Sequence, residues 1–361
     1  MTTTMRAMRL HEIGQPLQID EVPVPEVGSD DVLVKIAACG TQDGDHQLIY
    51  GLLPSNMRPV TIGHEPAGTV AAAGCNVRNC KEGDRVYIAP AISCGQCAAC
   101  LSDNQPYCSS YAVMGMTYFA PLGRALFERY GHGGFAEYML VPVGNIWHLP
   151  ADISFDQAAK LAFLGVAVKA VEKARLRPGE SVLVAGASGA LGVCTVMAAL
   201  AMGAATVIAV ARDSKRLARV KALDPGRVET VSTRQNPGLD CVRDLLPGPG
   251  VDVLIDALPT ALDVTKQAIQ LLRKGGRAVL IGGVQGPLDI DYRAFMLSEI
   301  EVTGSVGMGR SSFPRLVELV RRGVVDFADF VTHRFPLEQA NEAIAAVINK
   351  TGNPLGVVVI P

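Results

Sequence analysis

The chain has 361 residues, of which 49 % are hydrophobic and 19 % charged, and its formal net charge is −2. This length predicts two domains, and the composition is typical of a folded globular protein and excludes a disordered one. The near-neutral charge gives no reason to expect a nucleic acid or an anionic membrane as a partner. No apolar run near the N-terminus is long enough for a secretory signal, so we expect a cytoplasmic protein.

The first 150 residues are rich in Val, Gly and Pro and contain short alternating runs. Examples are DVLVKIAACG at 31–40 and GDRVYIAP at 83–90. This pattern predicts an irregular β-barrel. Two clusters of ligand-type side chains also lie here, AACGTQDGDHQ at 37–47 and GHEPAG at 63–68. They raise the question of whether this part of the chain holds a catalytic metal ion.

Four of the nine cysteines form a cluster with the spacing C-x2-C-x2-C-x7-C, namely Cys94, Cys97, Cys100 and Cys108. Four thiolates complete a tetrahedral zinc shell and leave no open position, which predicts a structural zinc site. An iron–sulfur cluster is an alternative that the last interval fits poorly, and disulfides are disfavoured in a reducing compartment. We interpret the other five as small buried or half-buried side chains: Cys39, Cys75, Cys80, Cys194 and Cys241.

The segment 109–130 follows this cluster and contains several aromatic residues and two arginines. They are Tyr118, Phe119, Arg124, Phe127, Arg129 and Tyr130. The segment either lines a pocket for an aromatic or carboxylated substrate, with Tyr118 as a proton donor, or packs as a lobe at a subunit interface. We assign no role to it from the sequence.

From residue 155 onward, apolar strand candidates alternate with helical stretches. The strand candidates are SVLVAG (181–186), TVIAVA (206–211), VDVLIDA (251–257) and RAVLIGG (277–283), and TKQAIQLLRKGG (265–276) is a helical stretch between two of them. This alternation predicts a parallel, doubly wound sheet. Residues 181–211 carry no charge and are long enough to span a bilayer, but glycines divide the run into a strand, a turn, a helix and a second strand. After Gly304 we expect two helices, FPRLVELVRRG and LEQANEAIAAVINK, and a closing strand, GVVVIP.

The turn after the first of these strands reads GASGALG, residues 186–192. Glycines at this spacing allow a tight turn and a close approach to a pyrophosphate, which binds at the positive end of the next helix. A turn without a ligand is the alternative. We expect the cofactor to contact Gly186, Ser188, Gly189, Ala190, Leu191 and Gly192, and also Ala257 and Gly282 at the ends of two further strands.

The second strand ends without the acidic residue that usually binds the adenosine ribose of NAD. Ala211 occupies that position, and Arg212 and Lys215 follow it. An arginine here can bind a 2′-phosphate bidentately, so NADP(H) is favoured over NAD(H). Two alternatives stay open: Asp213 lies one register shift from an NAD site, and the basic residues are simply solvated.

These features together resemble the medium-chain dehydrogenase/reductase superfamily in its zinc alcohol dehydrogenase branch. The resemblance rests on the order of GHEPAG, the four-cysteine lobe, GGFAEYMLVP (133–142) and GASGALG, and it covers essentially the whole chain. It implies a GroES-like catalytic domain at 1–154 with a zinc lobe at 94–108, a Rossmann domain at 155–308, and a segment at 309–361 that returns to the first domain. It also implies a cofactor cleft between the domains, a small-molecule substrate, and a homodimer or homotetramer.

The resemblance also allows a comparison of the catalytic positions. Gln42 stands where the family has a zinc-binding cysteine, and the third zinc ligand falls on Ala162 or Phe163. Gly44 and Gln47 replace the hydroxyl residue and the histidine of the family's proton relay. The three candidate catalytic residues match the family's pattern: Asp45 as the acid behind the ligands, His64 as the second ligand and Glu65 as its neighbouring acid.

One imidazole, one carboxylate and a neutral amide lack the thiolates that give such sites their affinity for zinc. We therefore expect no tightly bound catalytic zinc, although a local shift that brings in Asp43, His46 or Cys39 would supply an unorthodox site. Purely structural roles also stay open for the candidate residues: Asp45 as a loop-stabilising acid, His64 as a buried histidine and Glu65 as its orienting partner.

Three hypotheses for the function follow. The leading one is an NADP(H)-dependent reductase of an activated C=C bond, or of a carbonyl activated by protein donors, because without zinc the developing negative charge must be delocalised or hydrogen-bonded. The second is an alcohol dehydrogenase with a non-standard zinc shell. The third is a nucleotide-binding protein without turnover.

Overall fold

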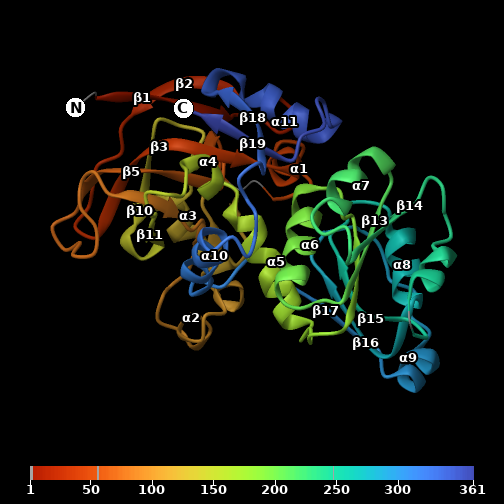
Figure 1. Cartoon of the computed structure of the whole chain (residues 1–361). Helices are drawn as coiled ribbons and strands as arrows, with labels where there is room; N and C mark the ends of the chain where they lie inside the picture. The colour runs from red at the N-terminus through yellow and green to blue at the C-terminus, as the bar shows by residue number, and fades with distance from the viewer. Residues whose placement is uncertain (1–2, 55–56, 247) are drawn as a thin grey trace. The chain divides into compact units, whose positions relative to one another are not determined.

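The computed structural model describes residues 3–54, 57–246 and 248–361 (Figure 1). Two compact units divide the chain, and each is described by itself. Unit 1 comprises Met1–Ala162, Gly309–Arg321 and Asp326–Pro361, and unit 2 comprises Phe163–Met308 and Arg322–Val325. The first division lies at Ala162, eight residues beyond the expected 154, because the short helix α4 (Phe155–Ala158) contacts strands β3 (Asp31–Thr41) and β5 (Glu65–Ala73) of unit 1.

Unit 1 is built around the long strand β3, which pairs with β5, with β10 (Tyr138–Pro142) and with β19 (Gly356–Ile360). Nine of its eleven residues are buried, as expected for a strand covered on both faces. The sheet continues through β6 (Arg85–Ile88) and β11 (Ile146–His148) on one side and β18 (Val331–Pro336) on the other. The C-terminal segment therefore supplies two strands to the sheet begun by the N-terminal residues.

Two smaller sheets complete unit 1. One has the order β2-β1-β4, formed by Gln18–Pro23, Thr4–Leu10 and Val60–Thr61, and the other has the order β7-β8-β9, formed by Ala91–Ile92, Ala112–Val113 and Thr117–Tyr118. The helices are α1 (Asp43–Ile49), α2 (Ala98–Leu101), α3 (Arg124–Tyr130), α10 (Ser312–Arg321) and α11 (Ala340–Asn349), with 3-10 turns at Gln105–Tyr107, Pro121–Gly123, Val143–Asn145 and Leu337–Gln339.

Unit 2 is a doubly wound sheet of six parallel strands in the order β14-β13-β12-β15-β16-β17. The strands are Val228–Ser232, Thr206–Ala211, Ser181–Ala185, Val251–Asp256, Leu272–Leu280 and Glu301–Gly304. The helices are α5 (Leu161–Lys173, which begins in unit 1), α6 (Ala190–Ala201), α7 (Ser214–Lys221), α8 (Leu262–Gln270) and α9 (Tyr292–Ser298), with a 3-10 turn at Asp240–Leu245. The fold class expected from the sequence, a GroES-like β-domain with a Rossmann sheet, is confirmed.

Two details of unit 2 differ from the expectations. The helix expected over 265–276 ends at Gln270, and Leu272 already belongs to strand β16. Strands β14 and β17 were not expected, because charged or polar residues interrupt both short runs.

The charge-free run 181–211 forms β12, α6 and β13. Within the described residues, no helix is both long and apolar enough to span a membrane.

Candidate functional site

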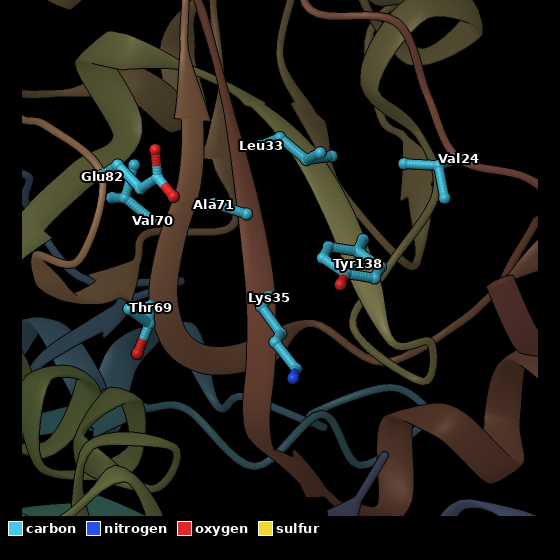
Figure 2. Close-up of a pocket in the computed structure, with 8 residues that line it drawn as sticks. All are labelled: Val24, Leu33, Lys35, Thr69, Val70, Ala71, Glu82 and Tyr138. Atoms are coloured by element: carbon cyan, nitrogen blue, oxygen red, sulfur yellow. The ribbon is translucent and has the colours of Figure 1, made fainter. Parts of the chain in front are cut away.

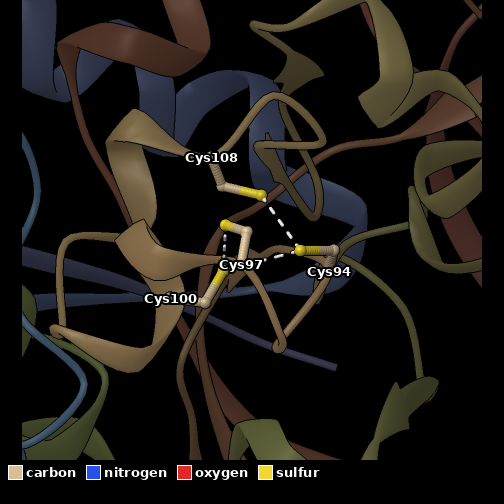
Figure 3. A group of neighbouring side chains, drawn as sticks. All are labelled: Cys94, Cys97, Cys100 and Cys108. Carbon is tan, nitrogen blue, oxygen red and sulfur yellow. Dashed lines mark hydrogen bonds between the residues drawn. The ribbon is translucent and has the colours of Figure 1, made fainter.

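The four-cysteine lobe folds as the spacing predicts. The sulfur atoms of Cys94, Cys97, Cys100 and Cys108 all lie within 4.8 Å of one another and face a common centre (Figure 3). Three of the sulfur–sulfur separations are 3.5, 3.6 and 3.9 Å, close to the edge of about 3.8 Å of a tetrahedron with zinc–sulfur bonds of about 2.3 Å. Backbone N–H groups of Gln96 and Cys97 lower the pKa of Cys94 to about 6, which favours its thiolate. The four residues fit a structural zinc ion and leave no ligand position open.

Asp103 ties this lobe to the residues before helix α10. Its carboxylate accepts hydrogen bonds from the backbone N–H of Arg310 at 2.7 Å and from the hydroxyl of Ser311 at 2.6 Å. These donors and Gln105 outweigh burial and lower the pKa of Asp103. The cysteine lobe thus anchors the returning C-terminal segment within unit 1.

Asp45 and His64 meet where β3 gives way to α1. The Oδ2 atom of Asp45 accepts hydrogen bonds from Thr41 Oγ1 at 3.0 Å and from the backbone N–H of Gln42 at 2.9 Å. Its Oδ1 atom lies 3.3 Å from His64 Nδ1, and the two side chains are 1 % and 7 % exposed. Gln42 Nε2 contacts the other ring nitrogen, His64 Nε2. Asp45 Oδ1 is thus the carboxylate oxygen at ion-pair distance from His64 Nδ1.

Burial lowers the pKa of His64, but Asp45 and then Glu65 outweigh that effect. The net result is a pKa above the ordinary value of a histidine, because both nearby carboxylates favour the imidazolium form. The imidazole is thus held in one orientation and keeps its proton to higher pH than a free histidine.

Glu65 instead pairs with Lys160, a residue that the sequence reasoning did not single out. Lys160 Nζ donates to Glu65 Oε2 at 2.5 Å and to the backbone carbonyl of Thr41 at 3.1 Å. The two side chains are 0 % and 1 % exposed. The sequence signal for it is a single lysine between the apolar runs at 158–159 and 161–168.

The other positions of the family's zinc site and proton relay hold no further ligand set. Ala162 lies in the first turn of α5 and offers no donor atom, and Gln47 donates to Asp43 at 2.5 Å. His46 packs against Tyr50, and Cys39 is buried with a pKa well above its usual value because burial disfavours the thiolate. Within the described residues, only the four-cysteine cluster brings three or more His, Cys, Asp or Glu ligand atoms together. The donor set around His64 does not fit the three-ligand shell of a catalytic zinc.

The glycine turn lies where strand β12 passes into helix α6, next to the point where the strand order of unit 2 reverses between β12 and β15. Gly189 is the residue before α6, so the backbone N–H groups of Ala190 and Leu191 stand in its first turn, where a phosphate would bind. A Cβ atom on Gly192 would lie 2.2 Å from the carbonyl oxygen of Gly186, so close packing of helix and strand requires glycine here. Ala257 borders Gly186, and Gly282 borders Ala257. The residues expected to contact the cofactor therefore gather at one edge of the sheet.

The structure also shows which residues end the second strand. Ala211 is the last residue of β13, and Asp213 is the residue before α7. The Asp213 carboxylate accepts hydrogen bonds from the backbone N–H groups of Lys215 at 2.9 Å and Arg216 at 3.2 Å. These bonds lower its pKa, and they commit the carboxylate to capping the helix. Arg212 and Lys215 are exposed beside it.

The segment 109–130 is held in place by ion pairs, hydrogen bonds and aromatic contacts within unit 1. Arg129 and Tyr130 each reach a carboxylate oxygen of the buried Asp31 at 2.7 Å, and Arg124 pairs with Glu128. Tyr118 packs edge-on against the buried Phe127. Met116, which the sequence did not single out, approaches the same point as His64: a Cβ placed on Gly44 would lie 3.2 Å from Met116 Cε and 3.8 Å from His64 Cε1. Of the scattered cysteines, Cys75 is exposed and departs from the expectation.

Unit 1 also has a shallow pocket of about 280 Å³ on its β-sheet (Figure 2). The residues that line it are Val24, Leu33, Lys35, Thr69, Val70, Ala71, Glu82 and Tyr138. None of the candidate catalytic or cofactor-binding residues contributes to it, and we assign it no role.

Comparison with known proteins identifies the family. Residues 28–151 match the family described as alcohol dehydrogenase GroES-like domain, and residues 190–322 match zinc-binding dehydrogenase. An NAD-dependent alcohol dehydrogenase of Sulfurisphaera tokodaii is 32 % identical over 94 % of this chain and 95 % of its own length. The chain belongs to the medium-chain zinc-type alcohol dehydrogenase superfamily. It is thus an oxidoreductase of the alcohol dehydrogenase type.

Two further relatives from this superfamily resemble the chain over its full length. Sorbitol dehydrogenase of Bacillus subtilis is 27 % identical over 99 % of this chain and 97 % of its own length. A solved structure of a zinc-binding dehydrogenase from Sinorhizobium meliloti, bound to NADP, is 29 % identical, covers 100 % of both chains and superposes with a TM-score of 0.86. The resemblance noted from the motifs is therefore confirmed, while the loss of a catalytic zinc stays a prediction.

Proposed function

We propose that this chain catalyses NAD(P)-dependent hydride transfer between a small alcohol or polyol and the corresponding carbonyl compound. The observation that carries the proposal is the similarity to dehydrogenases of alcohols and of sorbitol over 94 % and 99 % of the chain, which includes both the His64 region and the glycine turn. This observation favours the reaction class of the second hypothesis, alcohol dehydrogenase, over the leading hypothesis, a reductase of an activated C=C bond or of a carbonyl activated by protein donors. It also argues against a binding protein without turnover. The non-standard zinc shell of the second hypothesis is not part of this proposal.

NADP(H) is the preferred cofactor in this proposal. The support is that Ala211 ends strand β13 without a carboxylate, that Asp213 caps helix α7, and that Arg212 is exposed beside them. A ribose 2′-phosphate would meet no carboxylate at Ala211 and would find an arginine able to bind it bidentately. The pyrophosphate would lie against Gly189, Ala190 and Leu191.

His64 is the proposed catalytic residue, and Asp45 is its positioning residue. A bound nicotinamide cofactor would supply the hydride acceptor for alcohol oxidation and the hydride donor for carbonyl reduction. The neutral His64 imidazole would take the hydroxyl proton of an alcohol at Nε2, and the imidazolium would give that proton to the oxygen of a carbonyl substrate. Gln42 lies at the same Nε2 atom and would be a second hydrogen-bond partner of the substrate oxygen. No step in this scheme uses a metal ion.

The structural zinc supplies no chemistry to this scheme, because its four cysteine ligands leave no position for a substrate. The zinc ion would hold the cysteine lobe together. Asp103, which belongs to that lobe, accepts hydrogen bonds from Arg310 and Ser311 and so ties the lobe to the C-terminal segment.

Reduction of an activated C=C bond is the second candidate. The support for it is that the resemblance to the family puts Gln42, and either Ala162 or Phe163, at two ligand positions of the zinc site, where they offer no anionic ligand. An enolate formed by hydride addition delocalises its charge and needs only hydrogen-bond donors.

Steady-state assays of purified protein separate the two candidates. We expect NADP⁺ reduction with members of a panel of polyols and secondary alcohols, and NADPH oxidation with the matching ketones. Turnover of enones with no turnover of any alcohol or ketone would contradict the proposal and support the second candidate.

A further inference from the structure

Lys160 is a buried ammonium at the centre of the site described above. It lies between helices α4 and α5, two residues before the third ligand position of the family's zinc site, Ala162. Its Nζ atom bridges the two chain segments that carry the other two ligand positions. It bonds the carbonyl of Thr41, next to Gln42, and the carboxylate of Glu65, next to His64.

The packing around this ion pair leaves no space for a side chain at Gly40. A Cβ atom on Gly40 would lie 2.3 Å from Glu65 Oε2 and 2.9 Å from Lys160 Cδ, so the strand passes directly over the pair. The pair is excluded from solvent, with exposures of 0 % and 1 %. A buried ammonium is retained only when a counter-ion and hydrogen-bond acceptors compensate its lost hydration, and Glu65 and Thr41 do so here.

Two consequences follow for a metal ion at His64. Glu65 is the carboxylate adjacent to the only matched ligand, and it is already the counter-ion of Lys160. Lys160 also lies close enough for its charge to act on the His64 ring. A divalent cation bound to His64 would therefore face a fixed positive charge in a low-dielectric interior. The other nearby carboxylate, Asp45, lies at the Nδ1 side of the ring and already accepts hydrogen bonds from Thr41 and Gln42.

We propose that the Lys160 ammonium is the resident cation of the His64 site and that it keeps divalent metal ions out of it. Lys160 acts as a positioning residue, since it holds Glu65 away from the ligand set of His64. The chain then binds one zinc ion per subunit, at the cysteine lobe, instead of two. The proposal concerns metal occupancy and does not depend on which substrate is turned over.

Metal stoichiometry tests the proposal first. Wild-type protein is purified in the presence of excess zinc, dialysed and measured by plasma mass spectrometry against protein concentration. We expect one zinc per chain, and Cys97→Ser should lose that zinc. Two tightly held zinc ions per wild-type chain would overturn the proposal.

The role of Lys160 itself is tested by calorimetric titration of zinc into protein whose cysteine lobe is already loaded. Lys160→Gln keeps an N–H donor for Glu65 and Thr41 but removes the charge, and we expect zinc to bind at His64 about 10- to 100-fold more tightly than in wild type. Lys160→Arg, which keeps the charge, is the matched control and should show no gain. If Lys160→Gln does not fold, Lys160→Met replaces it. A zinc affinity unchanged from wild type in a folded neutral variant would overturn the proposal.

Discussion

At the scale of single residues, the side chains at the end of β13 carry the proposed preference for NADP(H). Asp213 is the nearest acid to the end of β13, but its carboxylate accepts two backbone N–H bonds of helix α7. Both bonds go to Oδ1, so capping of α7 occupies one oxygen of this carboxylate and fixes its position. Arg212 is then the side chain that would distinguish the two cofactors.

Arg212→Ala should weaken NADP⁺ binding and leave NAD⁺ binding nearly unchanged. The loss of a charge-assisted bond to phosphate is worth about 1.5–3 kcal/mol, or roughly 10- to 100-fold in the dissociation constant. Fluorescence titration with both nucleotides measures the change. Arg175→Ala, which removes an exposed pair with Glu301, is the control. An equal loss for NAD⁺ and NADP⁺ would contradict the assignment.

The His64–Asp45 pair predicts a characteristic pH dependence. The charged groups that face His64 are Asp45 on α1, Glu65 on β5 and Lys160 before α5; the two carboxylates raise the pKa of His64, while burial and Lys160 lower it. Alcohol oxidation needs the neutral imidazole, so kcat/KM should rise as pH rises through a value above the ordinary pKa of a histidine. In Asp45→Asn that rise should move to lower pH.

Asp45→Asn retains an acceptor oxygen for Thr41 and Gln42, so it isolates the effect of charge. Asp43→Asn is its matched control, since Asp43 lies on the same helix and bonds Gln47 instead of His64. An identical pH profile in wild type and Asp45→Asn would show that another group controls the rate.

The raised pKa of His64 also makes the stability of the fold depend on pH. The stabilisation from protonated His64 is fully present below the pKa that this residue has in the unfolded chain, and it is lost as pH rises through the pKa in the folded chain.

At the scale of elements, the cysteine lobe is held together chiefly by its ligands. Its helix α2 spans only Ala98–Leu101 and contains no buried residue. A four-residue helix has no stability of its own in water, so the zinc ion and the bonds of Asp103 must supply it.

Cys97→Ser should therefore destabilise unit 1 and expose residues 94–108 to protease. Loss of about 2 kcal/mol corresponds to a fall in melting temperature of about 4–8 °C for a unit of roughly 200 residues. Differential scanning fluorimetry and limited proteolysis measure both effects. Cys75→Ser, at an exposed cysteine outside the lobe, should change neither. A zinc-free Cys97→Ser protein with wild-type melting temperature would refute a structural role for the metal.

Several elements follow directly from local sequence. The strand–turn–helix of the cofactor site was predicted from GASGALG because the glycine spacing and apolar runs are local features of the chain. The end of α8 was not predicted from the sequence, since Leu271 and Leu272 continue the helical pattern. Leu272 is a strand residue only because it pairs with β15. Tertiary pairing overrides a weak local preference at such positions.

At the scale of the whole molecule, strand β17 is the last strand of the unit 2 sheet in the described chain. The neighbouring helix α9 exposes large apolar side chains, with Tyr292 at 81 %, Met296 at 57 % and Leu297 at 60 %. Exposed apolar side chains gathered on one helix of a unit whose sheet ends in an edge strand favour association with a second copy of the chain.

We expect a homodimer or homotetramer in solution. The double variant Met296→Lys/Leu297→Lys should shift the mass measured by light scattering toward the monomer while the circular dichroism stays the same. Leu122→Lys, at a 67 % exposed leucine of unit 1, is the control and should leave the mass unchanged. A monomeric wild type would contradict this prediction.

The sequence by itself determined the two-unit fold, the cysteine lobe and the cofactor turn, because each depends on residue types at short spacings. The tertiary structure alone decided how the remaining polar groups pair. Glu65 and Lys160 are 95 positions apart, and Arg129 and Asp31 are 98 apart. No periodicity links such residues; they meet because strands and loops distant in the chain pack together, and a buried charge must then bond whichever opposite charge the packing brings to it.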